Sequence, residues 1–132
     1  MLRIVAGLGA LLHLGFAYKE TFGWGPSFVS KAAPAWMREP DAQAHVAWAQ
    51  ELAFNVGAYN LVLAIGLAWT AVSDASMTRS LGMFFTLWLL TAAAAAAYTG
   101  VWPAVVAQGG LGLLLGIASF RMRQQRSSGG RA

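Results

Sequence analysis

The chain contains four long apolar runs, and these constrain its fold more than any other feature of the sequence. They extend over about residues 2–18, 52–72, 81–98 and 101–120, and the only charge inside them is that of Arg3. A helix needs roughly 20 apolar residues to cross a hydrocarbon layer about 30 Å thick, so each run can span a bilayer. Lipid cannot satisfy free backbone groups and the runs do not alternate like barrel strands, so each is predicted to be helical. The predicted fold is all-α, an integral membrane four-helix bundle.

The composition indicates that no soluble domain accompanies these runs. Hydrophobic residues make up 58% of the chain and charged residues 11%, whereas soluble domains have about 25% charged residues. So few charges cannot cover a water-exposed surface. We therefore expect a single membrane domain over residues 1–123. Residues 124–132, rich in Ser, Gly and Arg, are expected to form a mobile cytoplasmic tail.

Several classes of function are disfavoured by what the sequence lacks. It has no cysteine, which excludes disulfides, thiolate metal sites, thioether-bound haem and cysteine nucleophiles. There is no Gly-rich phosphate loop, no GxSxG motif and no pair of carboxylates within a run. The two histidines, His13 and His45, do not have the spacing of a metal site, so no metal is expected. The net charge of +4 comes largely from arginines after the last run, which indicates membrane orientation rather than nucleic-acid binding.

The distribution of Lys and Arg predicts how the chain is oriented. If both termini are cytoplasmic, six of the nine basic residues lie on that side and three, Lys19, Lys31 and Arg38, lie outside. The prediction is a multi-pass protein of the cell inner membrane, with an outer loop over residues 19–51 and a short inner turn over residues 73–80. The second helix is expected to begin near Asp41, after Pro40. An alternative for the first run is a signal peptide, because Arg3 precedes its apolar stretch.

Each run also carries stripes of small or polar residues at helical spacing. The first has Ala6, Ala10, His13, Ala17 and Glu20; the second has Glu51, Asn55, Tyr59 and Gly66 on one face and Ala53, Gly57, Asn60 and Ala64 roughly opposite; the last two have Gly82, Thr86 and Ala93, and Gln108, Gly112, Gly116 and Ser119. In membranes small residues allow close helix approach and polar residues bond between helices. The stripes are therefore expected to face protein.

His13 and Glu20 are the candidate chemical groups of the first run. They lie seven residues apart, or about 10 Å along a helix, so they share a face and need a third group to connect them. His13 could accept a proton, bind a ligand or serve as an axial ligand, or it could simply be a neutral ring bonded between helices. Glu20 lies near the predicted outer interface, where solvation or pairing with Lys19 is an alternative to a site role.

A second set of polar candidates consists of Asn55, Tyr59, Asn60 and Gln108. Amides in lipid need partners, because an unpaired amide costs several kcal/mol, so these residues could act purely as interhelical contacts. A polar pocket for a small lipophilic molecule with one polar group could also be lined by His13, Glu20, Asn55, Tyr59 and Gln108. The sequence does not decide between these two readings.

Two motifs resemble one family. The run from His13 to Trp24, HLGFAYKETFGW, and the run from Asn55 to Ala64, NVGAYNLVLA, resemble the small four-helix membrane proteins of the domain-of-unknown-function family numbered 1304. The resemblance favours seven site positions: His13, Glu20, Trp24, Asn55, Gly57, Tyr59 and Asn60. This chain departs from the pattern in Lys19, in a longer outer loop with prolines and in Val56, which puts hydrogen bonding at position 56 in doubt. The resemblance brings no reaction with it, so the chemistry and any cofactor stay open.

Three functional hypotheses remain. The leading one is a small membrane protein whose polar cluster holds the bundle together and binds a small lipophilic ligand or a partner helix. The second is a membrane enzyme or proton-coupled carrier that uses His13 and Glu20. The third is an accessory subunit of a larger membrane complex. The possible partners are a small lipophilic molecule, another membrane protein or a second copy of the chain in a homo-oligomer.

Overall fold

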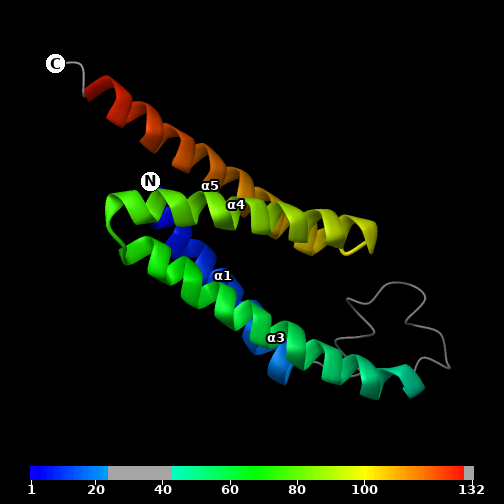
Figure 1. Cartoon of the computed structure of the whole chain (residues 1–132). Coiled ribbons are helices and arrows are strands. Elements are labelled where there is room, and N and C mark those ends of the chain that lie inside the picture. Colours follow the sequence, from blue (N-terminus) through cyan, green and yellow to red (C-terminus); the bar gives the residue numbers. More distant parts are fainter. Residues whose placement is uncertain (24–42, 130–132) are drawn as a thin grey trace.

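The structure, a computed structural model, describes residues 1–23 and 43–129, and these form four helices (Figure 1). They are α1 (Leu2–Phe22), α3 (Gln43–Val72), α4 (Ala75–Tyr98) and α5 (Trp102–Gly129). All four contain a segment long and apolar enough to span a membrane: Leu2–Phe22, Leu52–Val72, Ala75–Tyr98 and Trp102–Met122. The prediction of an all-α membrane four-helix bundle is confirmed.

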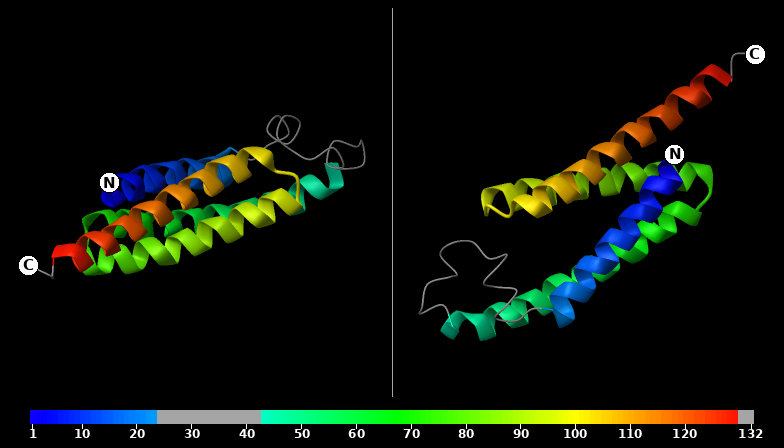
Figure 2. Two further views of the ribbon diagram at one scale, coloured as in Figure 1. Left: turned by 90° about the horizontal axis from the view of Figure 1, so that it is seen from above. Right: turned by 180° about the vertical axis from the view of Figure 1, so that it is seen from behind.

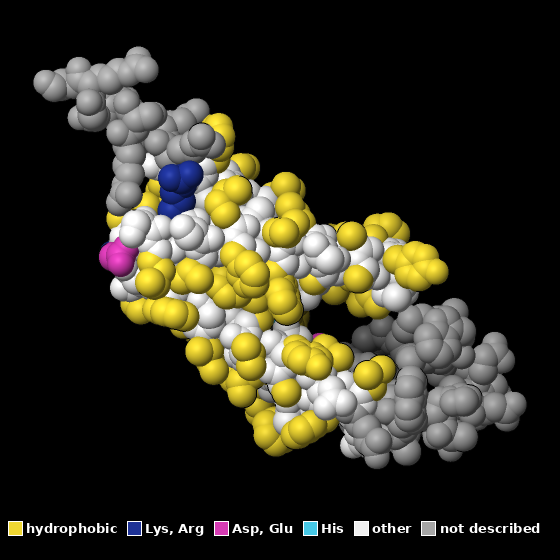
Figure 3. Space-filling view, in the orientation of Figure 1, with side chains coloured by type: hydrophobic (Ala, Val, Ile, Leu, Met, Phe, Trp, Pro, Cys, Tyr) yellow, Lys and Arg dark blue, Asp and Glu magenta, His cyan; other side chains and the backbone are white. Residues whose placement is uncertain are grey.

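The helices are arranged as two pairs that diverge from one end of the molecule. Helix α1 packs along α3, and α4 packs along α5 (Figures 1 and 2). The pairs meet at the end that carries Arg3, Arg79 and Arg121, which we call the basic end. They separate toward the opposite end, which we call the open end and where α4 finishes at Tyr98. The space-filling view shows a notch between the two pairs at the open end, which we call the wedge (Figure 3).

A leucine-rich core joins the two pairs. Its buried members are Leu2, Leu63, Leu67, Phe85, Leu89, Leu111, Leu115 and Ala118. These residues come from all four helices, and most of them lie on stripes opposite exposed apolar side chains such as Leu11, Val62 and Leu87. Because lipid is as apolar as leucine, this contact is stabilised by close packing rather than by exclusion of water.

Glycines permit the close helix contacts that the small-residue stripes predict. A methyl group on Gly57 would lie 2.5 Å from Thr21 Oγ1 and 3.2 Å from the Ala17 carbonyl oxygen, so α3 lies directly against α1. A methyl group on Gly112 would lie 3.1 Å from Leu89 Cβ, where α5 lies against α4. The expectation that the stripes face protein is confirmed at both seams, but it is wrong for the other stripe of α3, where Asn55 and Tyr59 are exposed.

The connection between α3 and α4 is shorter than the predicted turn over residues 73–80, because only Ser73 and Asp74 lie between the two helices. Asp74 is the N-cap of α4, and its side chain accepts hydrogen bonds from the backbone N–H groups of Ser76 at 2.9 Å and Met77 at 3.0 Å. An aspartate in this position satisfies backbone donors that the first helical turn leaves free. Helix α4 therefore begins at Ala75, six residues before the apolar run.

The chain reverses between α4 and α5 at Gly100, which has a positive φ of 75°. Val101 N–H donates to the Ala96 carbonyl at 2.8 Å, and Gly100 N–H donates to the Ala97 carbonyl at 3.2 Å. Carbonyls at the end of α4 are thereby satisfied, as is usual where glycine follows a helix.

Two helices continue beyond the predicted spans. Helix α5 reaches Gly129, so its backbone is helical in part of the segment predicted to be a tail; the mobility and the cytoplasmic location of that segment stay predictions. Helix α3 begins at Gln43, before the apolar run at residue 52, as expected for a helix that projects from the bilayer. The proposed start at Asp41 lies outside the described residues.

Candidate functional site

Three polar side chains from α1 and α3 form one hydrogen-bonded chain inside the bundle. His13 Nδ1 lies 2.7 Å from Asn60 Oδ1, and Asn60 Nδ2 donates to Glu20 Oε2 at 2.6 Å. His13 is fully buried, Asn60 is 7% exposed and Glu20 is half-buried. We call this chain the polar relay. It connects the buried interior of the bundle to the part of α1 nearest the open end.

Asn60 is the third group that the spacing of His13 and Glu20 requires. The two residues are almost two helical turns apart on α1, too far to touch each other. Asn60 lies between them because it is one turn beyond Gly57, where α3 lies directly against α1. The small residue at position 57 thus brings the amide within reach of both partners.

The chemistry of the relay determines where the His13 proton lies. When Glu20 is ionised, its carboxylate only accepts hydrogen bonds, which matches the hydrogen bond that Asn60 Nδ2 donates to Glu20 Oε2. The Asn60 carbonyl oxygen then faces His13 Nδ1 and needs a donor there. The His13 ring therefore carries its proton on Nδ1, and in the neutral ring Nε2 has a free lone pair.

Nε2 of His13 is buried and has no hydrogen-bond partner among the described residues. The ring also has Phe16 as an edge-on aromatic neighbour, with 5.5 Å between the ring centroids. An unsatisfied buried polar atom costs about 1–3 kcal/mol, and low-dielectric surroundings enhance the penalty. A group that bonds to Nε2 would remove this penalty.

The family is settled by a match over most of the chain. The family described as "Protein of unknown function (DUF1304)" matches residues 7–120, which include all three members of the polar relay. The chain belongs to the DUF1304 family. No curated protein and no solved structure matched this DUF1304 chain.

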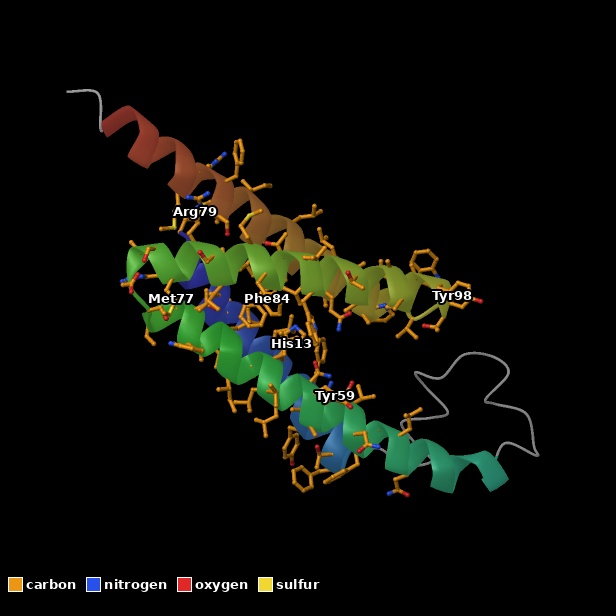
Figure 4. All side chains as sticks on the ribbon, in the orientation of Figure 1. His13, Tyr59, Met77, Arg79, Phe84 and Tyr98 are labelled. Atoms are coloured by element: carbon orange, nitrogen blue, oxygen red, sulfur yellow. The ribbon has the colours of Figure 1, made fainter. Side chains whose placement is uncertain are left out.

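The structure separates the other candidate positions of the DUF1304 chain from the polar relay. Asn55 and Tyr59 are exposed on α3, and Tyr59 is 69% exposed (Figure 4). Gln108 is half-buried on α5, in the helical turn next to Leu111, which packs against Gly9. Trp24 lies outside the described residues. A role for these four residues in a binding site stays a prediction.

Within residues 1–23 and 43–129, no group of three His, Asp or Glu side chains is arranged to hold a metal ion. His13 offers one nitrogen ligand, and its relay partners are occupied with each other. The arrangement is suited to hydrogen bonding rather than to metal coordination by protein groups alone.

Phe16 contacts the His13 ring, and the sequence patterns above do not single it out. It lies three residues after His13, which places it on the neighbouring stripe of α1, and its edge covers the imidazole. The spacing of three residues between His13 and Phe16 could have predicted this ring contact.

Proposed function

We propose that this membrane protein binds a small lipophilic molecule that carries one hydrogen-bond donor, and that His13 Nε2 accepts that hydrogen bond. The observation that carries the proposal is the buried Nε2 atom without a described partner. Because Nδ1 is engaged by Asn60, a neutral His13 can only accept at Nε2. A hydroxyl, phenol or amide N–H group fits this requirement, whereas an ether or a ketone does not.

The wedge is the proposed route to the site from the bilayer. On α3, Gly66 lies directly against the Phe85 ring of α4. Tyr59 lies two turns earlier on the same stripe but is exposed, since the helix pairs have separated by that level. Figure 4 shows His13 inside the bundle and Tyr59 farther toward the open end. A lipophilic molecule could therefore approach between the pairs, with Phe85 closing the inner limit of the wedge.

The geometry favours binding over a proton-transfer role for His13 and Glu20. Among the described contacts, His13 and Glu20 are connected only through their hydrogen bonds to the Asn60 side chain. A carboxamide neither takes up nor releases a proton at ordinary pH, so it orients the imidazole without conducting protons. The hydrogen bond between Asn60 and His13 Nδ1 determines which ring nitrogen carries the proton, and Nε2 is therefore the acceptor.

The proposal includes the cell inner membrane as the location, with both termini cytoplasmic. The bias of six basic residues against three supports this orientation.

The alternative to a small ligand is a partner helix, from an accessory complex or a second copy of the chain. That helix would donate the hydrogen bond to His13 Nε2.

Nitrogen NMR of selectively ¹⁵N-histidine-labelled protein in lipid nanodiscs tests the proposal directly. The chain has two histidines, so His45→Gln assigns the His13 signals. We expect a protonated Nδ1 and an unprotonated Nε2. Addition of para-octylphenol should shift the Nε2 signal, while its methyl ether, which has no donor, should leave that signal in place.

His13→Phe should weaken binding of para-octylphenol about threefold to tenfold, the effect of one neutral hydrogen bond. Asn55→Ala is the matched control, because Asn55 is exposed on α3 and should bind the phenol as the wild type does. A proton on Nε2, or equal shifts with the phenol and its ether, would contradict the proposal. A shifted Nε2 signal that depends on protein concentration would instead identify a partner helix as the donor.

A further inference from the structure

A cavity of about 390 Å³ lies at the basic end, between the first turn of α1 and the last membrane turns of α5. It is lined by Met1, Leu2, Arg3, Ala118, Arg121 and Met122. This volume lies within the roughly 300–1,000 Å³ typical of small-ligand pockets. Two of the six lining residues are arginines and four are apolar, and two different helices supply the charges.

The two arginines have donors available for an anion. Arg3 Nη2 donates to the Ser73 carbonyl at 2.5 Å, which fixes the guanidinium at the end of α3. A guanidinium has five N–H donors, so most of those on Arg3 remain for another acceptor. Arg121 is exposed at the cavity. Planar guanidinium groups suit phosphate, because two parallel N–H groups match two phosphate oxygens.

The charge balance at the basic end also favours an anion. Arg3 and Arg121 line the cavity and Arg79 lies at the same end of the molecule (Figure 4), whereas the one carboxylate among the described side chains there is that of Asp74, at the start of α4. Figure 3 shows basic and acidic side chains together at this end. Asp74 is engaged in capping α4 through its contacts with Ser76 and Met77. Positive charge therefore predominates around the cavity.

The place of the cavity relative to the spans indicates a lipid rather than a soluble anion. Arg3 is at the start of one span and Arg121 at the end of another, so the cavity lies where the hydrocarbon layer meets the headgroups. Leu2, Ala118 and Met122 form the apolar wall next to the guanidinium groups. A soluble phosphate would leave this wall in contact with water, whereas the glycerol backbone and first methylenes of a phospholipid would cover it.

We infer that this cavity is a binding site for an anionic phospholipid, with its phosphate between Arg3 and Arg121 and its glycerol region against Leu2, Ala118 and Met122. Basic pockets between transmembrane helices bind anionic headgroups in this way. The inference is independent of the proposed ligand at His13, which lies deeper in the bundle.

Native mass spectrometry of the full chain, released from nanodiscs that contain equal amounts of phosphatidylglycerol and phosphatidylcholine, tests the inference. The wild type should retain phosphatidylglycerol preferentially. Arg121→Gln should lower that preference about fivefold, the effect of one arginine near a lipid surface. Arg3→Gln should do the same, and Arg3→Lys should restore part of it because the charge returns without the planar donor pair.

Arg79→Gln is the matched control, since it removes an arginine from the same end without removing a residue of the cavity wall. Because Arg3 also bonds to Ser73, the variant Arg121→Gln is decisive if Arg3→Gln lowers thermal stability. Equal losses in Arg79→Gln and Arg121→Gln, or no lipid preference in the wild type, would overturn the inference. Inorganic phosphate that displaces phosphatidylglycerol at millimolar concentration would assign the site to a soluble anion instead.

Discussion

Asn60 is the residue on which the polar relay depends, because it makes both of its hydrogen bonds. It accepts from the His13 ring and donates to the Glu20 carboxylate. Loss of His13 or Glu20 leaves one polar group of the Asn60 amide without its partner. Loss of Asn60 leaves both His13 and Glu20 without a partner. In lipid the unfolded helices also find hydrogen-bond partners, so each bond contributes about 0.6 kcal/mol and at most about 1.7 kcal/mol.

Substitution at the three relay positions should follow a definite order of destabilisation. Asn60→Leu should lower the free energy of unfolding most, by roughly 1–3 kcal/mol, because both bonds are lost. His13→Phe should cost less, and Glu20→Gln least, because a glutamine oxygen still accepts from Asn60 Nδ2. Equilibrium unfolding in mixed micelles with increasing sodium dodecyl sulfate measures all three values.

Asn55→Ala is the control for this series, since Asn55 is exposed and its replacement should change stability by less than about 0.5 kcal/mol. The double variant His13→Phe with Asn60→Leu should be less destabilised than the sum of the single variants, since both remove the same bond. Additive effects, or an equally large loss in Asn55→Ala, would show that the relay does not hold α1 and α3 together.

At the scale of helices, the α1–α3 pair is defined by backbone proximity rather than by large side chains. The absent side chain of Gly57 allows α3 to approach Thr21 and the Ala17 carbonyl of α1. On α1, Gly9 likewise lies close to Leu111 of α5 and Leu67 of α3, whereas Gly15 does not serve packing in this way. A Cβ atom on Gly15 would meet no other atom within 4 Å.

Gly57→Ala should force α1 and α3 apart and weaken the polar relay. The added methyl group would lie 2.5 Å from Thr21 Oγ1, so we expect a loss of roughly 1–3 kcal/mol of stability from overpacking. Gly15→Ala, on the same pair, should be neutral or stabilise the protein by up to about 1 kcal/mol. Thermal unfolding in detergent compares the two, and a larger loss in Gly15→Ala would contradict the predicted contact.

The start of α4 depends on the Asp74 cap. Asp74→Ala should lower stability by about 1 kcal/mol, because the backbone N–H groups of Ser76 and Met77 lose their acceptor. Asp74→Asn should retain most of that stability, since an asparagine oxygen caps equally well. Hydrogen exchange of the first turn of α4 measures the effect; equal losses in both variants would show that the charge of Asp74, rather than its capping, is what matters.

At the scale of the whole molecule, two tightly packed pairs share one leucine-rich core and separate at the open end. Phe85 and Leu89 of α4 belong to the core with Leu67 of α3, whereas Tyr59 on α3 is exposed. The core lies nearer to the basic end, and the wedge lies beyond it (Figure 1). This asymmetry gives the two ends different chemistry: clustered arginines at one and an apolar opening at the other.

The orientation in the membrane can be tested with single cysteines, because the chain has none of its own. Ser76 lies exposed near the basic end, and Thr99 is exposed after α4 at the open end. In intact cells a membrane-impermeant maleimide should label Thr99→Cys and should label Ser76→Cys only after permeabilisation. The reverse pattern would place the termini outside.

The sequence by itself was sufficient for the number of spans and their helical state, and it identified the stripes of small and polar residues but not which of the two stripes on α3 faces protein. Hydrocarbon thickness and the need to satisfy backbone groups leave little choice for four apolar runs of this length. His13, Glu20 and Asn60 were also recognisable as unusual, because polar side chains inside spans are costly. Asp74 and Gly100, by contrast, set helix ends that the apolar runs do not reveal, since capping depends on side-chain and backbone geometry outside the runs.

Only the tertiary structure decided which polar residues meet. Helical spacing places Asn55 and Tyr59 on one face of α3 and Asn60 on the other, but it does not say which face meets α1. That choice depends on the contact of Gly57 with α1, which brings Asn60 between His13 and Glu20 and leaves Asn55 and Tyr59 exposed. Local periodicity follows from the chain alone, whereas the pairing of faces follows from close packing between segments far apart in the sequence.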